Sequence, residues 1–233
     1  MKSLFVTGTD TGIGKTTVAC ALVRAFNAHG APALGMKPVA SGCRQTPAGL
    51  RNDDAERLIA AGPHALSYSD VNPYAFAAPI APHVAAADAG VDISLATIAR
   101  AYAQLRAQAG MIIVEGAGGW MAPLSDPLMQ RDLVCALDLD VVIVVGLRLG
   151  CINHALLTTR AVLADGCRVA GWIANRIDPH MLRAEDSIAT LRARIDAPLL
   201  GVLAHAASEE QARDALAEGI APLIAPGIGD VAP

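Results

Sequence analysis

Residues 8–17 read GTDTGIGKTT and lie between an apolar segment at 3–7 and an alanine- and leucine-rich segment at 14–29. The first segment predicts a buried strand and the second a helix, which is the setting that a phosphate-binding P-loop requires. Glycines let the backbone approach a ligand closely, and the amide groups at a helix start point at phosphate oxygens. We expect the phosphates to be contacted by Thr11, Gly12, Ile13, Gly14, Lys15, Thr16 and Thr17.

The loop departs from the usual P-loop spacing at one position. The pattern G-x-x-x-x-G-K-[ST] would place glycine at position 9, where this chain has Thr9, and Gly8 comes one residue earlier. The alternative is a glycine-rich turn ahead of an ordinary helix. We prefer the P-loop because strand, loop, Gly-Lys-Thr and helix follow in the required order. Lys15 is then expected to neutralise the β- and γ-phosphates, and Thr16 to place its hydroxyl on Mg²⁺.

Strand-like and helix-like segments alternate along the chain. Further strands are expected at 33–39, 111–115, 141–146, 169–175 and 199–203. Further helices are expected at 53–61, 93–109, 152–164, 181–195 and 209–218. Such alternation predicts right-handed βαβ units, and therefore a three-layer α/β/α fold of the P-loop NTPase type around a mostly parallel sheet.

The chain has one stretch that interrupts this alternation. Residues 63–92 are rich in proline, alanine and aspartate, and we expect an ordered insertion there rather than a linker. Residues 1–225 are expected to form a single domain. Residues 226–233 contain glycine and proline and are expected to be a flexible tail.

Composition excludes several classes of function. The net charge of the 233 residues is −4 with no basic cluster, which disfavours nucleic-acid binding. No apolar run reaches the roughly 18 residues of a membrane helix, and no signal peptide is evident. The five cysteines are widely spaced without a C-x-x-C pair, which argues against zinc and a redox dithiol. We therefore expect reduced thiols and a cytoplasmic protein.

The loop at 8–17 resembles that of the dethiobiotin synthetases, and further segments agree with this family in order and at similar spacing. These segments are KPVASG at 37–42, NDD at 52–54, EGAGG at 115–119, GCINHA at 150–155 and NR at 175–176. The loop alone is moderately specific, whereas the set is highly specific. The resemblance covers residues 1 to about 205, and the chain after residue 203 matches poorly.

The resemblance implies an ATP-dependent cyclo-ligase of biotin biosynthesis. Members of the family join 7,8-diaminononanoate and CO₂, which can be supplied as bicarbonate, into the ureido ring of dethiobiotin. ATP is converted to ADP and phosphate, and Mg²⁺ is the implied cofactor. The family is a homodimer in which the long substrate lies near the subunit interface, so we expect a homodimer here.

Three oxygen-bearing residues are the expected magnesium ligands. Glu115 closes the run MIIVE, and an acid at the end of a buried strand is costly unless it is paired or near a metal. Asp54 alone is equally explained as an acid in the first turn of a helix, where the dipole favours it. The resemblance favours Asp54 as the third contact beside Thr16 and Glu115, a set of hard ligands that suits Mg²⁺.

The resemblance also assigns substrate and catalytic roles. Lys37 and Lys15 are the expected catalytic residues, although a lysine at position 37 would otherwise be a solvated surface charge. Ser41 is expected to contact the substrate, and its alternative is a turn serine. Amides at the helix start formed by Gly150, Cys151 and Asn153 are expected to bind the remote carboxylate, where the rival explanation is a plain helix cap by Asn153.

The remaining expected contacts are with the nucleotide. Asn175 resembles the family's adenine-reading asparagine, whose amide offers a donor and an acceptor, and Arg176 follows it. Gly116, Ala117 and Gly118 are expected to shape the loop after the strand that ends at Glu115. No pair of histidines has metal-ligand spacing, and we assign them no role.

Two other classes of P-loop protein compete with this assignment. A cobyrinate-type amide synthetase carries an additional glutaminase region, for which this chain is too short. A partition or septum-positioning ATPase carries a signature lysine five residues before the lysine of Gly-Lys-Thr, and that position is Asp10 here. Such a scaffold ATPase would respond to a DNA or lipid partner, whereas a synthetase would respond to the diamine.

Overall fold

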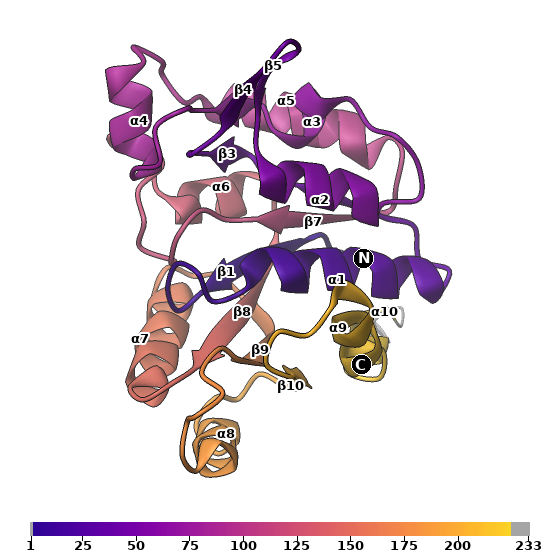
Figure 1. Ribbon diagram of the computed structural model, residues 1–233, viewed down its shortest axis with the longest axis vertical. Coiled ribbons are helices and arrows are strands. Elements are labelled where there is room, and N and C mark those ends of the chain that lie inside the picture. Colours follow the sequence, from indigo (N-terminus) through magenta and orange to yellow (C-terminus); the bar gives the residue numbers. More distant parts are fainter. Residues whose placement is uncertain (1, 225–233) are drawn as a thin grey trace, which may run out of the picture.

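The computed structural model describes residues 2–224 of the chain. A six-stranded sheet forms its centre, and all neighbouring strands in this sheet run parallel (Figure 1). Across the sheet the strands are β10 (Leu199–Leu203), β9 (Val169–Arg176), β8 (Asp140–Leu147), β1 (Leu4–Gly8), β7 (Met111–Glu115) and β2 (Ala33–Met36). The flexible tail expected at 226–233 lies outside the described residues.

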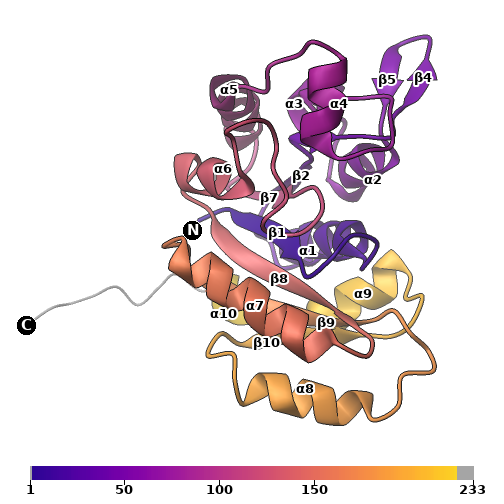
Figure 2. The same ribbon diagram turned by 90° about the vertical axis from the view of Figure 1, so that its left-hand side faces the viewer.

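Helices cover both faces of this sheet (Figure 2). One face packs against α1 (Lys15–Ala28), α9 (Glu209–Leu216) and α10 (Ala221–Ile224). The other face packs against α5 (Leu95–Arg106), α6 (Gln130–Ala136), α7 (Cys151–Ala164) and α8 (Ala184–Arg192). In β1 the side chains alternate, so that Leu4 and Val6 face α1 while Phe5 joins the opposite core. The expected three-layer fold with a parallel sheet is confirmed, and burial on both faces explains the continuous apolar strands.

The expected strand at 33–39 is wrong in its second half. Strand β2 ends at Met36, and the chain then leaves the central sheet at Lys37 and Pro38. Proline has no amide hydrogen to donate to a neighbouring strand, which favours an end to pairing here. Val39–Ala40 forms a separate strand, β3, which pairs with β6 (Tyr74–Ala75). The break places the Lys37 side chain at the carboxyl edge of the sheet.

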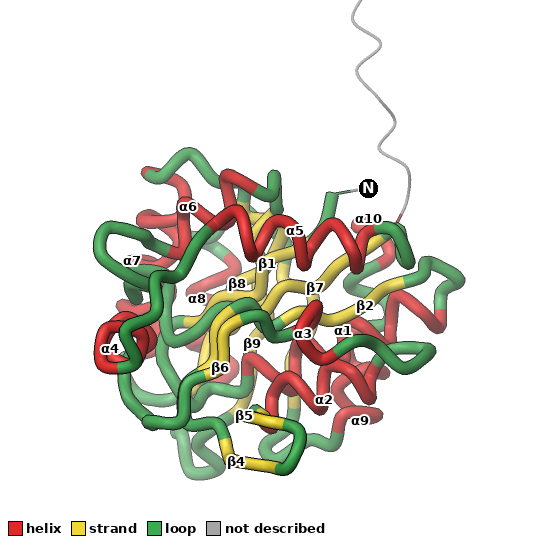
Figure 3. The backbone as a smooth tube through the Cα atoms, turned by 90° about the horizontal axis from the view of Figure 1, so that it is seen from above, coloured by secondary structure: helices red, strands yellow, loops and turns green. Residues whose placement is uncertain are grey.

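Residues 63–92 hold three short elements. These are α3 (Tyr68–Val71), β6 and α4 (Pro82–Asp88), which lie in front of the sheet together with a hairpin in the view of Figure 3. The hairpin, β4 (Arg44–Thr46) and β5 (Gly49–Arg51), leads into α2 (Asp53–Ala61), which packs beside β2. Neither the hairpin nor α6 was expected from the sequence, and the helix expected from residue 181 begins at Ala184. Within residues 2–224, no helix has the length and apolar character to cross a bilayer.

Candidate active site

The phosphate-binding loop follows β1 and opens α1. Two of its glycines have left-handed backbone angles, with φ of 72° at Gly12 and 90° at Gly14, which caps the helix. Side chains with a Cβ rarely adopt this conformation, so both positions require glycine. The loop thereby connects the carboxyl end of β1 to the first residues of α1, Lys15 and Thr16. Parallel α/β folds bind their ligands beyond the carboxyl ends of the strands, at the point where the strand order reverses. In this sheet that point lies at β1.

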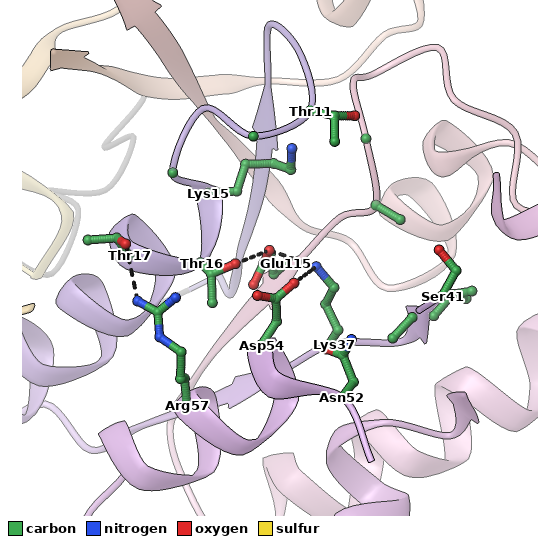
Figure 4. Close-up of a pocket in the computed structure, with 16 residues that line it drawn as sticks. Thr11, Lys15, Thr16, Thr17, Lys37, Ser41, Asn52, Asp54, Arg57 and Glu115 are labelled. Atoms are coloured by element: carbon green, nitrogen blue, oxygen red, sulfur yellow. Dashed lines mark hydrogen bonds and ion pairs between the residues drawn. The ribbon is translucent and has the colours of Figure 1, made fainter. Parts of the chain in front are cut away.

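A cavity of about 380 Å³ lies at this edge of the sheet (Figure 4). It brings together four segments that are far apart in sequence: the P-loop, the chain after β2, the start of α2 and the chain after β7. The lining residues are Thr11, Gly12, Gly14, Lys15, Thr16, Thr17, Lys37, Val39, Ala40, Ser41, Asn52, Asp54, Arg57, Glu115, Ala117 and Gly118. Most of the residues that the sequence singled out therefore share one cavity.

Lys37 is the centre of an ion-pair cluster in which Lys37 and Glu115 are buried and Asp54 is half-buried. Its Nζ lies 2.7 Å from Glu115 Oε1 and 3.1 Å from Asp54 Oδ2. The Thr16 hydroxyl donates to the same Glu115 oxygen at 2.9 Å. Burial alone would lower the pKa of Lys37, but the charges and hydrogen bonds of Glu115 and Asp54 outweigh it and raise that pKa. Burial alone would raise the pKa of Asp54, but the Lys37 charge, hydrogen bonds from Thr16 and Lys37 and the Arg57 charge together outweigh it and lower that pKa. Both groups are thus charged at neutral pH.

Lys15 lies along its own loop. Its Nζ donates to the backbone oxygen of Asp10 at 2.9 Å, and Asp10 is itself held by an ion pair with Arg148. Burial, and then the nearby charge of Lys37, lower the pKa of Lys15 to about 8. A phosphate anion in the cavity would favour the charged form of this lysine. The site therefore holds two lysine cations beside the amides of the helix start.

The residues around Glu115 fit a magnesium ion. Glu115 is 1% exposed, and its Oε2 accepts no hydrogen bond within residues 2–224. A buried carboxylate oxygen without a partner is costly, and a hard cation would satisfy it. In the same part of the chain, no three histidine, cysteine or acidic side chains gather as a metal site. A cation here would take two carboxylates and the Thr16 hydroxyl from the protein and its other ligands from water and phosphate, which is typical of Mg²⁺.

Several expected nucleotide contacts lie beside the cavity rather than in its lining. Ile13 is buried under the loop, and Gly116 has no room for a Cβ because Phe5 and Gln130 lie too close. The Asn175 amide donates to the backbone oxygen of Ile13 at 2.7 Å, so β9 supports the P-loop directly. Arg176 forms an ion pair with Glu185 of α8.

The helix start expected to bind the remote carboxylate lies outside this cavity. Gly150, with φ of 93°, caps α7 without a side-chain hydrogen bond, and Cys151 is buried. Asn153 is exposed and does not cap the helix, so the capping alternative is wrong. The neighbouring Leu149 is 96% exposed, which marks this end of α7 as an open apolar surface.

Sequence reasoning missed Arg57. This side chain lies on α2 one turn after Asp54, donates to Thr17 Oγ1 at 3.1 Å and pairs with Glu209 Oε1 at 3.0 Å. The spacing of three residues places Asp54 and Arg57 on one face of a helix, and this signal was available in the sequence. Because the cavity is lined by Arg57, its guanidinium is a third cation near the P-loop.

We expect Arg57→Met to raise the dissociation constant for MgATP about fivefold, which corresponds to about 1 kcal/mol, a modest value for a half-buried cation. Arg24→Met is the matched control, because Arg24 pairs with the same Glu209 and does not line the cavity. Isothermal titration should show unchanged affinity in the Arg24 variant. Equal losses in both variants would mean that Arg57 acts only by fixing α9.

The parallel sheet, the P-loop and the lysines around one cavity define a P-loop nucleotide-binding α/β protein. Solved structures agree at the level of the fold. The MinD cell division protein of Aquifex aeolicus superposes with a TM-score of 0.55 and 15% identity over 98% of this chain and 99% of that chain. A ParA family ATPase from Chlorobium tepidum superposes with a TM-score of 0.52 and 14% identity, over 95% of this chain and 94% of that chain. At such low identity, these likenesses show the fold alone.

Sequence comparisons are more specific than the fold. A family described as an AAA domain matches residues 2–212. The ATP-dependent dethiobiotin synthetase BioD of Xanthomonas oryzae pv. oryzae is 58% identical over 85% of this chain and 89% of its own length. The enzyme of the same name from Xylella fastidiosa is 52% identical over 88% of this chain and 91% of its own length. The chain therefore belongs to the family of ATP-dependent dethiobiotin synthetases.

Proposed function

We propose that the cavity of Figure 4 is where the chain carries out the reaction of its family. As a member of that family, the chain forms dethiobiotin in an ATP-dependent ligase reaction of biotin biosynthesis. The observation that carries the placement is the position of Lys37, which meets Glu115 and Asp54 in the same cavity as the P-loop lysine. The substrates are ATP, 7,8-diaminononanoate and CO₂.

The reaction proceeds in three steps. One amine of the substrate attacks CO₂ and, after losing a proton, becomes a carbamate. A carbamate oxygen then attacks the γ-phosphorus of ATP, which releases ADP and gives a mixed carbamic–phosphoric anhydride. The second amine attacks the carbonyl carbon, and the C–O bond to phosphate breaks, which closes the urea ring and releases phosphate. No covalent bond to the protein is needed, so catalysis consists of positioning and charge stabilisation.

The lysines supply the positive charge for these steps. Lys15 neutralises the β- and γ-phosphates, with the loop amides of residues 11–17 around them. Lys37 stabilises the negative charge of the carbamate and of the transferred phosphoryl group. Both cations also disfavour protonation of the substrate amines, which must be neutral to attack. Ser41 lines the same cavity as Lys37 and would hydrogen-bond the diamine.

Magnesium would be held by Thr16, Asp54 and Glu115. When bound, it would neutralise charge on the phosphate oxygens. Asp54 reaches the cluster from α2 and Glu115 from β7, so the ligands come from separate elements of the fold. Glu115 Oε2, which has no hydrogen-bond partner in the part of the chain that the structure describes, supports this assignment.

Adenine and the far end of the diamine need contacts beyond the cavity lining. Because Asn175 donates through Nδ2 to the P-loop, its Oδ1 is left to accept from the adenine amino group, and Arg176 follows at the same edge. We place the substrate carboxylate at the start of α7, on Gly150, Cys151 and Asn153, within a homodimer. The exposed Leu149 and Leu182, 96% and 87% accessible, border that helix start and support an interface there.

The order of bond formation can be tested with ¹⁸O. Bicarbonate labelled in all oxygens, mixed rapidly with enzyme, diamine and MgATP and quenched before exchange with water, should give phosphate that carries one labelled oxygen. The label arises because the C–O bond to phosphate breaks in the last step. Mass spectrometry of phosphate without label, formed together with dethiobiotin, would exclude the anhydride.

A further inference from the structure

The loop after β7 contributes Ala117 and Gly118 to the cavity, and its two ends are held differently from its middle. At the near end Gly116 donates its amide to Val6 of β1 at 3.0 Å. At the far end the Trp120 ring packs edge-on against Phe5 at 6.1 Å, and its Nε1 donates to Asp165. These contacts fix Gly116 and Trp120 at the two ends of the loop. They do not hold Ala117, Gly118 and Gly119 between them, so the middle of the loop needs a separate support.

That support is the side chain of Gln130. This residue is the first of α6, and it is 0% exposed. Its Nε2 donates to two carbonyls of the loop, to Ala117 O at 2.8 Å and to Gly119 O. A buried amide of this kind is costly unless it is hydrogen-bonded. Both donor hydrogens are used here, whereas Oε1 accepts no hydrogen bond within residues 2–224. The other end of the amide, Oε1, lies against Gly116, where an added Cβ would approach it to 2.2 Å.

The two hydrogen bonds orient the peptide planes of the loop. In a trans peptide the carbonyl and the following amide N–H point in opposite directions. Because Ala117 O points at Gln130, the N–H of Gly118 points away from it. Gln130 does not line the cavity of Figure 4, but it lines a small space behind the loop with Pro38 and Val39. The Gly118 N–H is therefore turned from the buried side toward the active-site cavity.

We propose that Gln130 is a positioning residue of the reaction, which holds the loop so that the Gly118 amide faces the substrate beside Lys37. The inference rests on the proposed function, because Ala117 and Gly118 line the same cavity as Lys37 and Ser41, to which the carbamate and the diamine are assigned. Gln130 touches no substrate and acts through the loop alone. Without its two donors, the carbonyls of Ala117 and Gly119 are free to rotate toward the cavity.

Gln130→Met tests this role, because it keeps the length of the side chain and removes both donors. We expect kcat/KM for the diamine to fall about tenfold, with the dissociation constant for MgATP changed less than about threefold. A tenfold loss corresponds to about 1.4 kcal/mol, which is comparable to one or two neutral hydrogen bonds. Val134→Ala is the matched control, since Val134 is a buried residue of the same helix that packs in the core. Its kcat/KM should stay within about twofold of the wild-type value.

Backbone hydrogen exchange provides a readout independent of turnover. Residues 116–119 should exchange faster in Gln130→Met than in Val134→Ala at equal global stability. Equal kcat/KM in the wild type and Gln130→Met, or equal losses in both variants, would overturn the proposal. If Gln130→Met did not fold, Gln130→Leu would take its place. If the wild type formed no dethiobiotin the proposed function would fail, whereas an active wild type with an equally active Gln130→Met would refute only the role of Gln130.

Discussion

Replacement of Lys37 with methionine should lower kcat for dethiobiotin formation by about 10²–10³-fold, the range seen when one donor to a transition-state anion is removed. Lys37 is buried and lies between two carboxylates in the cavity, so no solvent cation can replace it at the same place. The change also leaves Glu115, 1% exposed, without its ion-pair partner. Loss of one member of a buried pair should therefore reduce the free energy of unfolding by about 3 kcal/mol.

Two controls separate these effects. Lys2→Met removes a lysine whose ion pair with Asp138 is exposed, and it should change neither turnover nor stability. Lys37→Arg keeps the charge and should retain most of the stability while turnover stays low, because a planar guanidinium does not reproduce an ammonium at this distance. Steady-state rates measure the turnover of each variant, and urea unfolding measures its free energy of unfolding. A Lys37→Met variant that kept wild-type turnover would remove this residue from the mechanism.

Replacement of Gly14 with alanine should weaken MgATP binding about 100-fold or more, equivalent to about 3 kcal/mol. A Cβ at this position would lie 2.3 Å from Asn175 Nδ2, which is already held by Ile13 O. The left-handed backbone, with φ of 90°, adds its own strain. The P-loop can then accommodate the methyl group only by moving away from β9, which displaces the amides that face the phosphates.

Gly12→Ala is the matched variant, because it shares the positive φ and has nothing within 4 Å of the added Cβ. It should bear the backbone strain of about 1 kcal/mol without the collision, and so it should lose much less affinity. Titration of both variants with MgATP compares the two contributions. Equal affinities would show that the contact with Asn175 does not position the loop.

Much of the fold and of the cavity could be predicted because the signals were local. The order of strand, glycine-rich loop and helix at residues 3–29 predicted the P-loop, and the buried acid Glu115 at a strand end predicted a polar site there. The alternation of strand and helix segments predicted a parallel sheet, because parallel strands must be joined by a crossover connection, which is usually a helix. Lys37 and Asp54 needed the resemblance, because a lysine or an acid at a loop or helix start is ordinarily a surface residue.

The misses depend on contacts between distant segments. Pro38 ends the second strand, and only the structure shows that Val39 then pairs with Tyr74. The donors of Gln130 are invisible in sequence, because their partners are backbone oxygens more than ten residues away. The start of α7 lies apart from the cavity within one chain. Its expected role in binding the substrate carboxylate therefore depends on a homodimer, which the periodicity of one sequence does not predict.

The most direct test of the central claim is ring formation itself. The purified chain would be mixed with 7,8-diaminononanoate, bicarbonate, ATP and Mg²⁺, and dethiobiotin would be followed by mass spectrometry. We predict product only when all four are present, and none with Lys15→Ala, whose Nζ lies in the phosphate cavity. Tight ATP binding without any dethiobiotin would contradict the assignment and would leave only a nucleotide-binding P-loop protein.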